Sequence, residues 1–558
     1  MGAGGGEAGG QAGGAAGWGR AGRKRASHAA RGRPPTTVPI PEQPPRYGGV
    51  TISTANQNSS APRRNVLFII ADQWRADCLG HAGNPDVKTP NLDRLAAAGV
   101  SFSSCFNQTA PCGPSRMCIY TSRYMCSTRV VGNMTPLADP EENLAWHLAQ
   151  SGYRPGFIGY NDYAVDPQRL AQDDPRRAGL AYDNVLPGFE QIYYHEYDSD
   201  EYFAHLRSKG YAEDLLNHQA IHAPAVPPEG PGPHLPQHFP ARYAKEDSEC
   251  RFVTDKAIDF IRQRDQAPES GWVLSLNYIK PHPPNICCPP YHNMYDPDQL
   301  PGAVRHPDEL QPEHPYLRAL APDQLQSEHH LRQYRACYYG MISEVDDNIG
   351  LLIDALEESG QWDDTLIVFS SDHGEYLGDH YLTGKGHFYD SALNIPLIVR
   401  DPSKDADTSR GQRLDHLVES IDIAPTILDF LGLEIPDRFQ GRSLLGAWRA
   451  GAEYAPRSEI FHEFDYRMGP LRSDPQTDPD NHLLWVVRDQ HYKYVQFADP
   501  AVPPLLFDLA ADPGEFDNLA ADSAHAATVV EYCQKLLRWR MRHEDQRMEH
   551  WAQPHRMG

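Results

Sequence analysis

The chain has 558 residues and a net charge of −24, with a hydrophobic content of 40% and a charged content of 23% that are typical of a globular protein. The acidic excess disfavours nucleic acid as a partner, because binding a phosphate backbone requires a basic surface. No run approaches the roughly 18 apolar residues of a membrane helix, so we expect no membrane partner either.

The first 62 residues differ from the rest in composition. They are rich in Gly and Ala, then basic, then rich in Pro, and residues 1–64 hold nine Arg or Lys against two Glu. The segment lacks the 7–15-residue apolar core of a secretory signal. We expect a disordered N-terminal extension over residues 1–62, with a transit or nucleic-acid-binding tail as the alternative.

The first predicted strand covers residues 65–71 (NVLFIIA), an apolar run typical of a strand buried on both faces. It leads directly into Asp72. A short helix is predicted next, with Thr89 as N-cap, Pro90 at the first helical position and Gly99 as the stop.

Three later apolar runs predict further strands at residues 154–160, 272–278 and 365–370. The second is followed closely by His282 and the third by Asp372. Parallel α/β sheets form their sites at the carboxyl ends of strands, so these side chains and Asp72 are expected to share one site.

The remaining patterns complete an α/β arrangement, because strands that alternate with helices predict a mostly parallel sheet covered on both faces. Two Pro- and His-rich stretches are expected to be long excursions over the site, at residues 161–250 and 285–327. Other predicted elements are a long helix over about 328–359, a hairpin at 483–487 and 492–497, and a final helix over about 526–549.

Ten cysteines are spread along the chain, and none of their spacings is C-x-x-C. In a chain of this length they do not predict a disulfide framework, and a zinc ribbon is disfavoured. We therefore expect a cytoplasmic protein.

One cysteine stands in the run Pro111-Cys112-Gly113-Pro114-Ser115-Arg116, just before a helix predicted over about residues 114–123. The amide groups and dipole of a helix N-terminus favour an anionic sulfur or oxygen at Cys112. The alternative is a small buried residue before a proline turn.

The motif C-x-P-x-R follows a strand ending in Asp by some forty residues and precedes a strand ending in Asp-His-Gly. With the run TSRY at 121–124, it resembles the sulfatase family over about residues 63–545. The resemblance implies that a formylglycine-generating system oxidises Cys112 to formylglycine, whose hydrate attacks the ester, and that Arg116 holds this group.

The resemblance also implies an alkaline-phosphatase-like sandwich with a mostly parallel central sheet and a smaller C-terminal antiparallel sheet. The expected divisions are a catalytic domain over residues 63–455, a small sheet subdomain over 456–525 and a helical arm over 526–558.

A divalent metal site is predicted from Asp72 and Asp372, which are hard oxygen ligands, with His373, the residue-112 oxygen and Gln73 at longer range. For either Asp alone, a helix cap or turn role is the alternative. The common family pattern has Asp-Asp and Asp-Asn at these two places. Asp-Gln and Asp-His resemble the phosphonate monoester hydrolase branch instead, and the added nitrogen ligand favours Mn²⁺, with Zn²⁺, Fe²⁺ or Ca²⁺ as alternatives.

Four further residues are predicted to act on the substrate. Lys385, in a Gly-flanked loop, is expected to reach an anionic ester oxygen, and His282 to bind the substrate or protonate the leaving oxygen. Asn133 and Tyr160 are predicted neutral donors to the ester group. Asp162 departs from the small hydroxyl residue that the resemblance implies. Asp379 and His380 are interpreted as support for their loop, against a catalytic role.

The predicted function is hydrolysis of monoanionic sulfate, phosphonate or phosphodiester esters of small molecules. The alternatives are a dedicated aryl or alkyl sulfatase and a non-catalytic anion-binding relative, and the retention of the whole residue set disfavours the second. The final helix, with Leu536, Leu537 and Trp539, leaves a homo-oligomer open.

Overall fold

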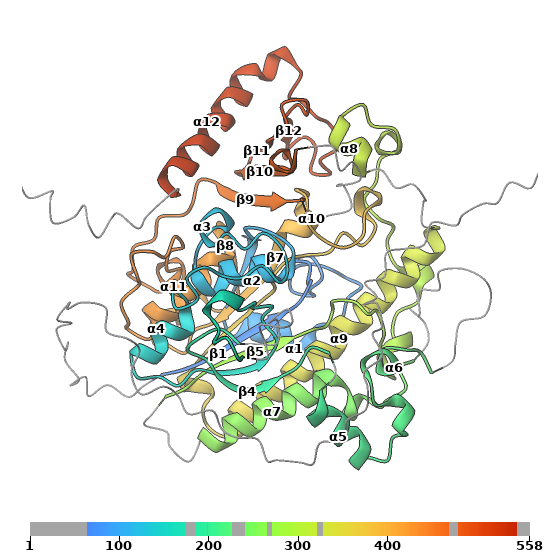
Figure 1. Ribbon diagram of the computed structural model, residues 1–558, viewed down its shortest axis with the longest axis vertical. Coiled ribbons are helices and arrows are strands. Elements are labelled where there is room, and N and C mark those ends of the chain that lie inside the picture. The colour runs from blue at the N-terminus through green and yellow to red at the C-terminus, as the bar shows by residue number, and fades with distance from the viewer. Residues whose placement is uncertain are drawn as a thin grey trace, which may run out of the picture. The chain divides into compact units, whose positions relative to one another are not determined.

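The computed structural model describes residues 64–174, 185–197, 199–225, 240–264, 271–320, 327–467 and 478–543 (Figure 1). The expected extension over residues 1–62 and the end of the predicted final helix lie outside these ranges. The strands are β1 (Asn65–Ala71), β2 (Val100–Phe106), β3 (Gly156–Gly159), β4 (Glu190–Tyr194), β5 (Val273–Tyr278), β6 (Thr365–Ser370), β7 (Asn394–Arg400), β8 (Gln412–Glu419), β9 (Ile460–Asp465), β10 (Leu483–Arg488), β11 (Tyr492–Phe497) and β12 (Leu505–Asp508).

The α-helices lie between the strands of the main sheet or after the last strand. They are α1 (Pro90–Ala97), α2 (Cys112–Thr121), α3 (Met125–Thr128), α4 (Leu144–Gln150), α5 (Asp200–Ser208), α6 (His218–Ile221), α7 (Glu249–Arg264), α8 (Pro315–Leu320), α9 (Glu328–Glu358), α10 (Asp390–Leu393), α11 (Ile423–Phe430) and α12 (Ala526–His543).

Eight strands form the main sheet in the order β4-β3-β5-β1-β6-β7-β2-β8. Neighbouring strands are parallel except for β7, which is antiparallel to both β6 and β2. The predicted mostly parallel central sheet is thereby confirmed, with one reversed strand that the sequence pattern did not reveal.

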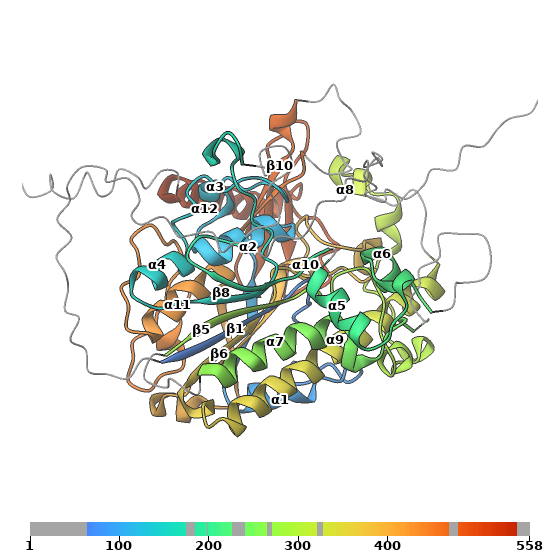
Figure 2. The same ribbon diagram turned by 60° about the horizontal axis from the view of Figure 1, so that its bottom comes forward.

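Two layers of helices cover this sheet, as Figure 2 shows most clearly. Alternate residues of β1 point to opposite faces. Leu67 and Ile69 belong to the core that includes α1, α7 and α9, whereas Val66 and Phe68 belong to the core that includes α2, α4 and α11. All seven residues of β1 are buried, which explains the uninterrupted apolar run.

The register places three strand ends at one edge of the sheet. Ala71 of β1 lies opposite Tyr278 of β5, and Ile70 of β1 lies opposite Ser370 of β6. The residues that follow β1 and β6 therefore emerge side by side, although about 300 positions separate them in the chain.

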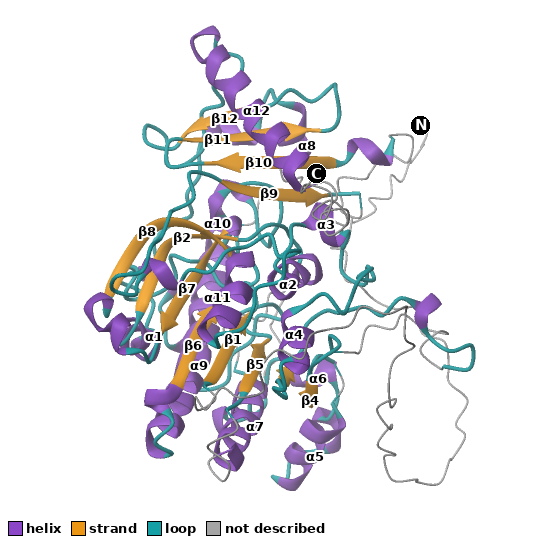
Figure 3. Cartoon of the chain, turned by 90° about the vertical axis from the view of Figure 1, so that its left-hand side faces the viewer, coloured by secondary structure: helices purple, strands orange, loops and turns teal. Residues whose placement is uncertain are grey.

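The second sheet has four antiparallel strands in the order β12-β11-β10-β9 (Figure 3). The predicted hairpin is confirmed as β10 and β11. Leu536 and Trp539 of α12 are buried in a core shared with this sheet, while Leu537 is 58% exposed. The domain boundaries expected from the sequence stay predictions.

Several sequence-based expectations need correction. The stretch 161–250 is not only an excursion, because it contains β4, an edge strand of the main sheet. Helix α2 begins at Cys112 rather than near Pro114. Gly99 does not cap α1, which ends at Ala97. A side chain at Gly99 would lie 2.3 Å from the carbonyl oxygen of Val399, so close backbone approach explains this glycine.

All ten cysteines lie within the described residues and none forms a disulfide, as expected. Among the helices of the described ranges, none combines the length and apolar composition needed to cross a bilayer.

Candidate active site

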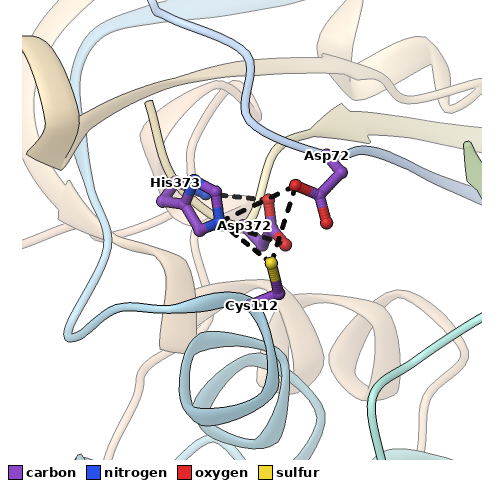
Figure 4. A group of neighbouring side chains, drawn as sticks. All are labelled: Asp72, Cys112, Asp372 and His373. Atoms are coloured by element: carbon purple, nitrogen blue, oxygen red, sulfur yellow. Dashed lines mark hydrogen bonds and ion pairs between the residues drawn. The ribbon is translucent and has the colours of Figure 1, made fainter. Parts of the chain in front are cut away.

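Four side chains meet at the shared strand edge (Figure 4). Asp72 follows β1, Asp372 and His373 follow β6, and Cys112 is the first residue of α2. One ligand atom from each lies within 4.8 Å of those of the other three, and all four residues are buried. The structure therefore brings together the predicted ligand set from segments that are about 300 residues apart.

Arg116 joins the helix to both strand ends. Its Nη2 donates to Asp72 at 3.0 Å and its Nε donates to Asp372 at 3.0 Å. The guanidinium is completely buried, and its Nη1 donates to the side chain of Asn277 and to the backbone oxygen of Tyr160. Because each of its three nitrogens donates a hydrogen bond, Arg116 fixes α2, and with it Cys112, against the two aspartates.

The two aspartates differ in proton affinity. Burial raises the pKa of Asp72, but His282, Lys385 and Arg116 lower it more, and the net pKa lies well below its ordinary value. Burial and the neighbouring Asp72 raise the pKa of Asp372 to about 8. A further positive charge is needed for both carboxylates to be ionised at neutral pH, which is what a divalent cation provides.

His373 has the form that a metal ligand requires. Burial and then Lys385 lower its pKa well below the ordinary value, so the imidazole is neutral. Its Nδ1 lies 3.1 Å from the carbonyl oxygen of Gly374, an acceptor only, so Nδ1 carries the proton. The lone pair of Nε2 is left facing Cys112 at 3.4 Å. Two carboxylates and one imidazole nitrogen thus fit a divalent ion that accepts mixed oxygen and nitrogen ligands.

The thiol of Cys112 is not anionic in this setting. Burial and then Asp72 raise its pKa well above the ordinary value. The expectation that the N-terminus of α2 favours an anionic sulfur here is therefore wrong for the thiol, because burial and nearby carboxylates outweigh the helix amides. The encoded side chain is a neutral thiol and a weak nucleophile.

Lys385 reaches the same point from its loop. Its Nζ donates to Cys112 Sγ at 2.9 Å and to Gln73 Oε1 at 3.0 Å, and lies 4.0 Å from Asp72 Oδ1. Burial lowers the pKa of Lys385, but Cys112 and Asp72 raise it more, and the net pKa is above the ordinary value. The ammonium is therefore charged and directed at the Cys112 sulfur.

The other predicted residues surround this group. The Asn133 side chain accepts a hydrogen bond from the backbone N–H of Gly113 at 2.9 Å, beside Cys112. The Tyr160 hydroxyl donates to Asp72, and its ring lies under the Arg116 guanidinium at 4.3 Å. Tyr160 is thus already engaged with the aspartate, in addition to any role toward substrate.

His282 lies close enough for its charge to affect Asp72 and His373. Burial and then Lys385 lower its pKa to about 4, so the ring is neutral near pH 7. In the free site His282 is therefore a neutral ring, and its predicted role toward the substrate stays a prediction. Its Nδ1 lies 2.6 Å from the carbonyl oxygen of Pro283, which fixes the proton on that nitrogen.

Asp162 is a third buried carboxyl near the site. Its Cβ lies 3.4 Å from the position of a Cβ on Gly113, and its charge raises the pKa of the Cys112 thiol. Burial raises the pKa of Asp162 itself to about 7.

Asp379, by contrast, forms ion pairs with Arg75 and Arg335, which agrees with its interpreted role in supporting the loop.

Sequence reasoning missed two residues that hold the site together. Asn277 is a polar residue at the end of the apolar strand β5, and it accepts from Arg116 at 2.9 Å. Glu375 is completely buried and accepts from the side chain of Gln73. The signal in both cases was a polar side chain within or just after a fully buried strand.

Comparison with known proteins agrees with this geometry. The family model described as Sulfatase matches residues 64–433, and the model described as N-sulphoglucosamine sulphohydrolase, C-terminal, matches residues 378–542. The chain belongs to the sulfatase family, and it is an ester hydrolase.

Its relatives include members of the wider alkaline phosphatase superfamily and other sulfatases. The chain is 38% identical over 88% of its length to the multifunctional alkaline phosphatase superfamily protein PehA of Trinickia caryophylli, of which it covers 97%. It is 27% identical to an arylsulfatase of Clostridium perfringens, with 85% and 93% of the two chains covered.

Among solved structures, the phosphonate monoester hydrolase of Agrobacterium radiobacter superposes with a TM-score of 0.79 at 36% identity, covering 87% of this chain and 97% of that one. The phosphonate monoester hydrolase SpPMH from Silicibacter pomeroyi gives a TM-score of 0.77 at the same identity and coverage. The predicted alkaline-phosphatase-like fold is thereby confirmed.

Proposed function

We propose that this chain hydrolyses monoanionic sulfate, phosphonate and phosphodiester esters of small molecules, with a formylglycine made from Cys112 and one divalent metal ion. The observation that carries the proposal is the convergence of Cys112, Asp72, Asp372 and His373 at one buried point. A neutral, buried thiol is poorly suited to attack an ester, which supports oxidation of this side chain. Formylglycine supplies, on hydration, one hydroxyl for attack and a second for release of the covalent ester.

The metal would be held by Asp72, Asp372 and His373, together with the oxygen at position 112 and Gln73 at longer range. Its chemistry is to lower the pKa of a bound hydroxyl and to polarise the ester oxygens. We favour Mn²⁺ because the set combines carboxylates with an imidazole nitrogen, and Zn²⁺, Fe²⁺ and Ca²⁺ are the alternatives.

The chain's own charges then prepare the position of the substrate. Lys385 binds an anionic oxygen of the ester, since its ammonium already points at the Cys112 sulfur from 2.9 Å. Arg116 is committed to Asp72 and Asp372, so its role is to hold residue 112 in place rather than to bind the ester. His282 is proposed to deliver a proton to the leaving oxygen, after an anionic substrate raises its pKa.

A substrate with one negative charge suits this site better than one with two. Lys385 contributes one cation on the substrate side, whereas Asp162 adds a buried carboxyl beside Gly113. A second charge on the ester would oppose ionisation of Asp162. Sulfate monoesters, phosphodiesters and phosphonate monoesters each carry one charge, and phosphate monoesters carry two near neutral pH.

The test is a substrate panel on protein of defined metal content, with formylglycine occupancy measured by peptide mass. Nitrophenyl esters of a sulfate, a phosphodiester, a phosphonate and a phosphate monoester are compared by kcat/KM. We expect turnover of all three monoanions and the poorest turnover of the dianionic phosphate. Hydrolysis of the sulfate alone would favour the dedicated aryl or alkyl sulfatase. No turnover at full formylglycine occupancy and metal content would leave the non-catalytic anion-binding relative.

A further inference from the structure

Glu375 is a buried carboxylate that belongs to neither the ligand set nor the charge network of Arg116. It lies completely inside the protein, two residues after His373. Its Oε1 accepts from the backbone N–H of Leu377 at 3.0 Å and of Gly384 at 2.6 Å. Its Oε2 accepts from the side-chain nitrogen of Gln73. Each of these contacts is to a donor without formal charge, so the carboxylate does not serve a salt bridge.

The contact with Gln73 decides which way that amide points. An ionised carboxylate only accepts hydrogen bonds, so the NH₂ group of Gln73 must face Glu375. The amide oxygen is then turned to the other side, where it accepts from Lys385 Nζ at 3.0 Å. The Gln73 backbone offers no freedom to compensate, because its N–H donates to Asp372 at 3.1 Å and its carbonyl accepts from Tyr338 at 2.6 Å.

The other oxygen of Glu375 holds the backbone that carries Lys385. Gly384 directly precedes Lys385, and its N–H donates to Glu375 at 2.6 Å. The same carboxylate thus fixes the lysine at two places, through its backbone and through the Gln73 amide that receives its ammonium. The ammonium in turn lies 2.9 Å from Cys112 Sγ.

We propose that Glu375 is a positioning residue which sets the orientation of the Gln73 amide, so that an oxygen rather than an NH₂ group faces Lys385 and the metal-binding cluster. The kinetic part of this inference rests on the proposed function, whereas its effect on cation binding does not.

The decisive variant is Glu375→Gln, which is nearly isosteric. The oxygen of the introduced amide can accept from the backbone N–H groups of Leu377 and Gly384 only if its NH₂ group faces Gln73. The Gln73 amide must then turn over and present its own NH₂ group to the Lys385 ammonium, so that donor faces donor. A second change, Gln73→Glu in the same chain, restores an acceptor on both sides. The double variant Gln73→Glu/Glu375→Gln exchanges the acid and the amide while keeping a donor opposite an acceptor between residues 73 and 375 and at Leu377, Gly384 and Lys385.

A matched control is Glu463→Gln, the same change at a buried carboxyl that accepts from the Cys126 backbone and lies in β9 of the small sheet. Each purified chain is assayed for melting temperature, Mn²⁺ affinity by calorimetry, formylglycine occupancy, and kcat and KM on the best ester of the panel.

For Glu375→Gln we expect a loss of about 10–100-fold in Mn²⁺ affinity and in kcat, the range found when a partner that orients a metal ligand is removed. Its melting temperature should stay close to that of Glu463→Gln. The double variant should exceed Glu375→Gln by at least about tenfold in both Mn²⁺ affinity and kcat. The proposal is overturned if Glu375→Gln lowers only the melting temperature, or if the double variant is no better than Glu375→Gln alone. Should the wild-type chain hydrolyse none of the esters, the proposed function fails, while Mn²⁺ affinity across the four chains still decides the role of Glu375.

Discussion

Two regions of the molecule bury charge, and only one of them forms a candidate active site. The first is the nucleophile cluster, which consists of Asp72, Cys112, Asp372 and His373, drawn in Figure 4, together with Arg116 and Lys385. The second is the small-sheet cluster, which consists of Asp390, Arg488, Lys493 and Glu515. Both join segments that are distant in sequence, and both contain a completely buried cation.

In the small-sheet cluster each charged side chain is paired with one of opposite charge. Lys493 Nζ lies 2.5 Å from a carboxylate oxygen of both Asp390 and Glu515, and it donates to the carbonyl of Phe388 at 2.9 Å. Arg488 completes the balance through Asp390 at 3.1 Å. With two cations and two carboxylates, nothing is left to attract a ligand, so this cluster stabilises the fold.

In the nucleophile cluster the donors converge on a point instead of pairing off. The lone pair of His373 and carboxylate oxygens of Asp72 and Asp372 surround Cys112, and Lys385 faces the same atom. Buried charge alone therefore does not mark a site. Convergence of acceptors that a cation could bridge is the feature that does.

The largest expected effect is at the centre of the nucleophile cluster. Cys112→Ser should reduce turnover by about 10⁴–10⁶-fold, as for other residues of a covalent catalytic set. Serine can form one ester but has no second hydroxyl to release it, so a single-turnover burst is expected. Stopped-flow assay of product release measures this, and Cys112→Ala is the control without a burst. Full activity in a wild-type chain whose peptide mass shows an unmodified thiol would contradict the assignment.

Asp372→Asn tests whether the convergence serves a metal. The variant should lose bound metal and activity together, with turnover lower by about 10³-fold, because several kcal/mol of transition-state stabilisation come from such an ion. Elemental analysis and kcat are measured on the same preparation. Normal metal content with lost activity would show that Asp372 acts elsewhere than on the ion.

Lysine truncations in the two clusters compare them directly. Lys385→Ala should lower kcat by about 10²–10³-fold with unchanged metal content, as expected for a lost transition-state donor. Lys493→Met should leave kcat per folded molecule unchanged but lower the free energy of unfolding by about 3–5 kcal/mol, since it leaves the buried Glu515 without a cation and Asp390 paired with Arg488 alone. Urea unfolding and steady-state kinetics separate the outcomes. If both variants lowered stability alone and to a similar extent, the two clusters would have the same structural role.

His282→Ala is expected to have a smaller effect that depends on the leaving group. With an alkyl leaving group turnover should fall about 10²-fold, at the lower end of general acid catalysis, whereas a nitrophenol needs little protonation and should show little loss. A plot of log kcat against leaving-group pKa measures the difference. An equal loss for both kinds of ester would leave His282 as an anion-binding residue.

The smallest effect concerns pH and a carboxyl outside both clusters. Burial raises the pKa of Glu463 from 4.5 to about 7. Since the folded state holds the proton more tightly, its contribution to stability is complete below about pH 4.5 and is lost as the pH rises to about 7. Glu463→Gln should flatten this part of the unfolding free energy between about pH 4.5 and 8, as measured by urea titration. An unchanged pH profile would mean that Glu463 is ionised throughout.

The sequence predicted the parts of the fold where one physical signal dominates. β1, β5 and β6 are buried on both faces, and their apolar runs ended at the residues that form the site. Several strands that escaped prediction carry mixed signals, although the apolar strand β7 was also missed. β2 includes three serines, β8 alternates with charged residues, and exposed Glu190 and Gln191 begin the edge strand β4. Strand order and the reversal of β7 depend on long-range packing, which no local pattern encodes.

For the site, local pattern and family resemblance gave the residues but not their partners. The sequence could not show that Arg116 donates to both Asp72 and Asp372, or that burial raises the pKa of the Cys112 thiol. Nor could it reveal Glu375, because its importance comes from the direction of one amide group.

The depth of Cys112 has a consequence for the order of events during synthesis. The side chain is 3% exposed, and it is enclosed partly by Asp372 and His373, which are made about 260 residues later. An enzyme that oxidises this cysteine cannot reach it once those residues have closed over it. If Cys112 is oxidised as proposed, we therefore expect the oxidation to precede the folding of the segment that carries Asp372 and His373, so that oxidation and folding compete for the same chain.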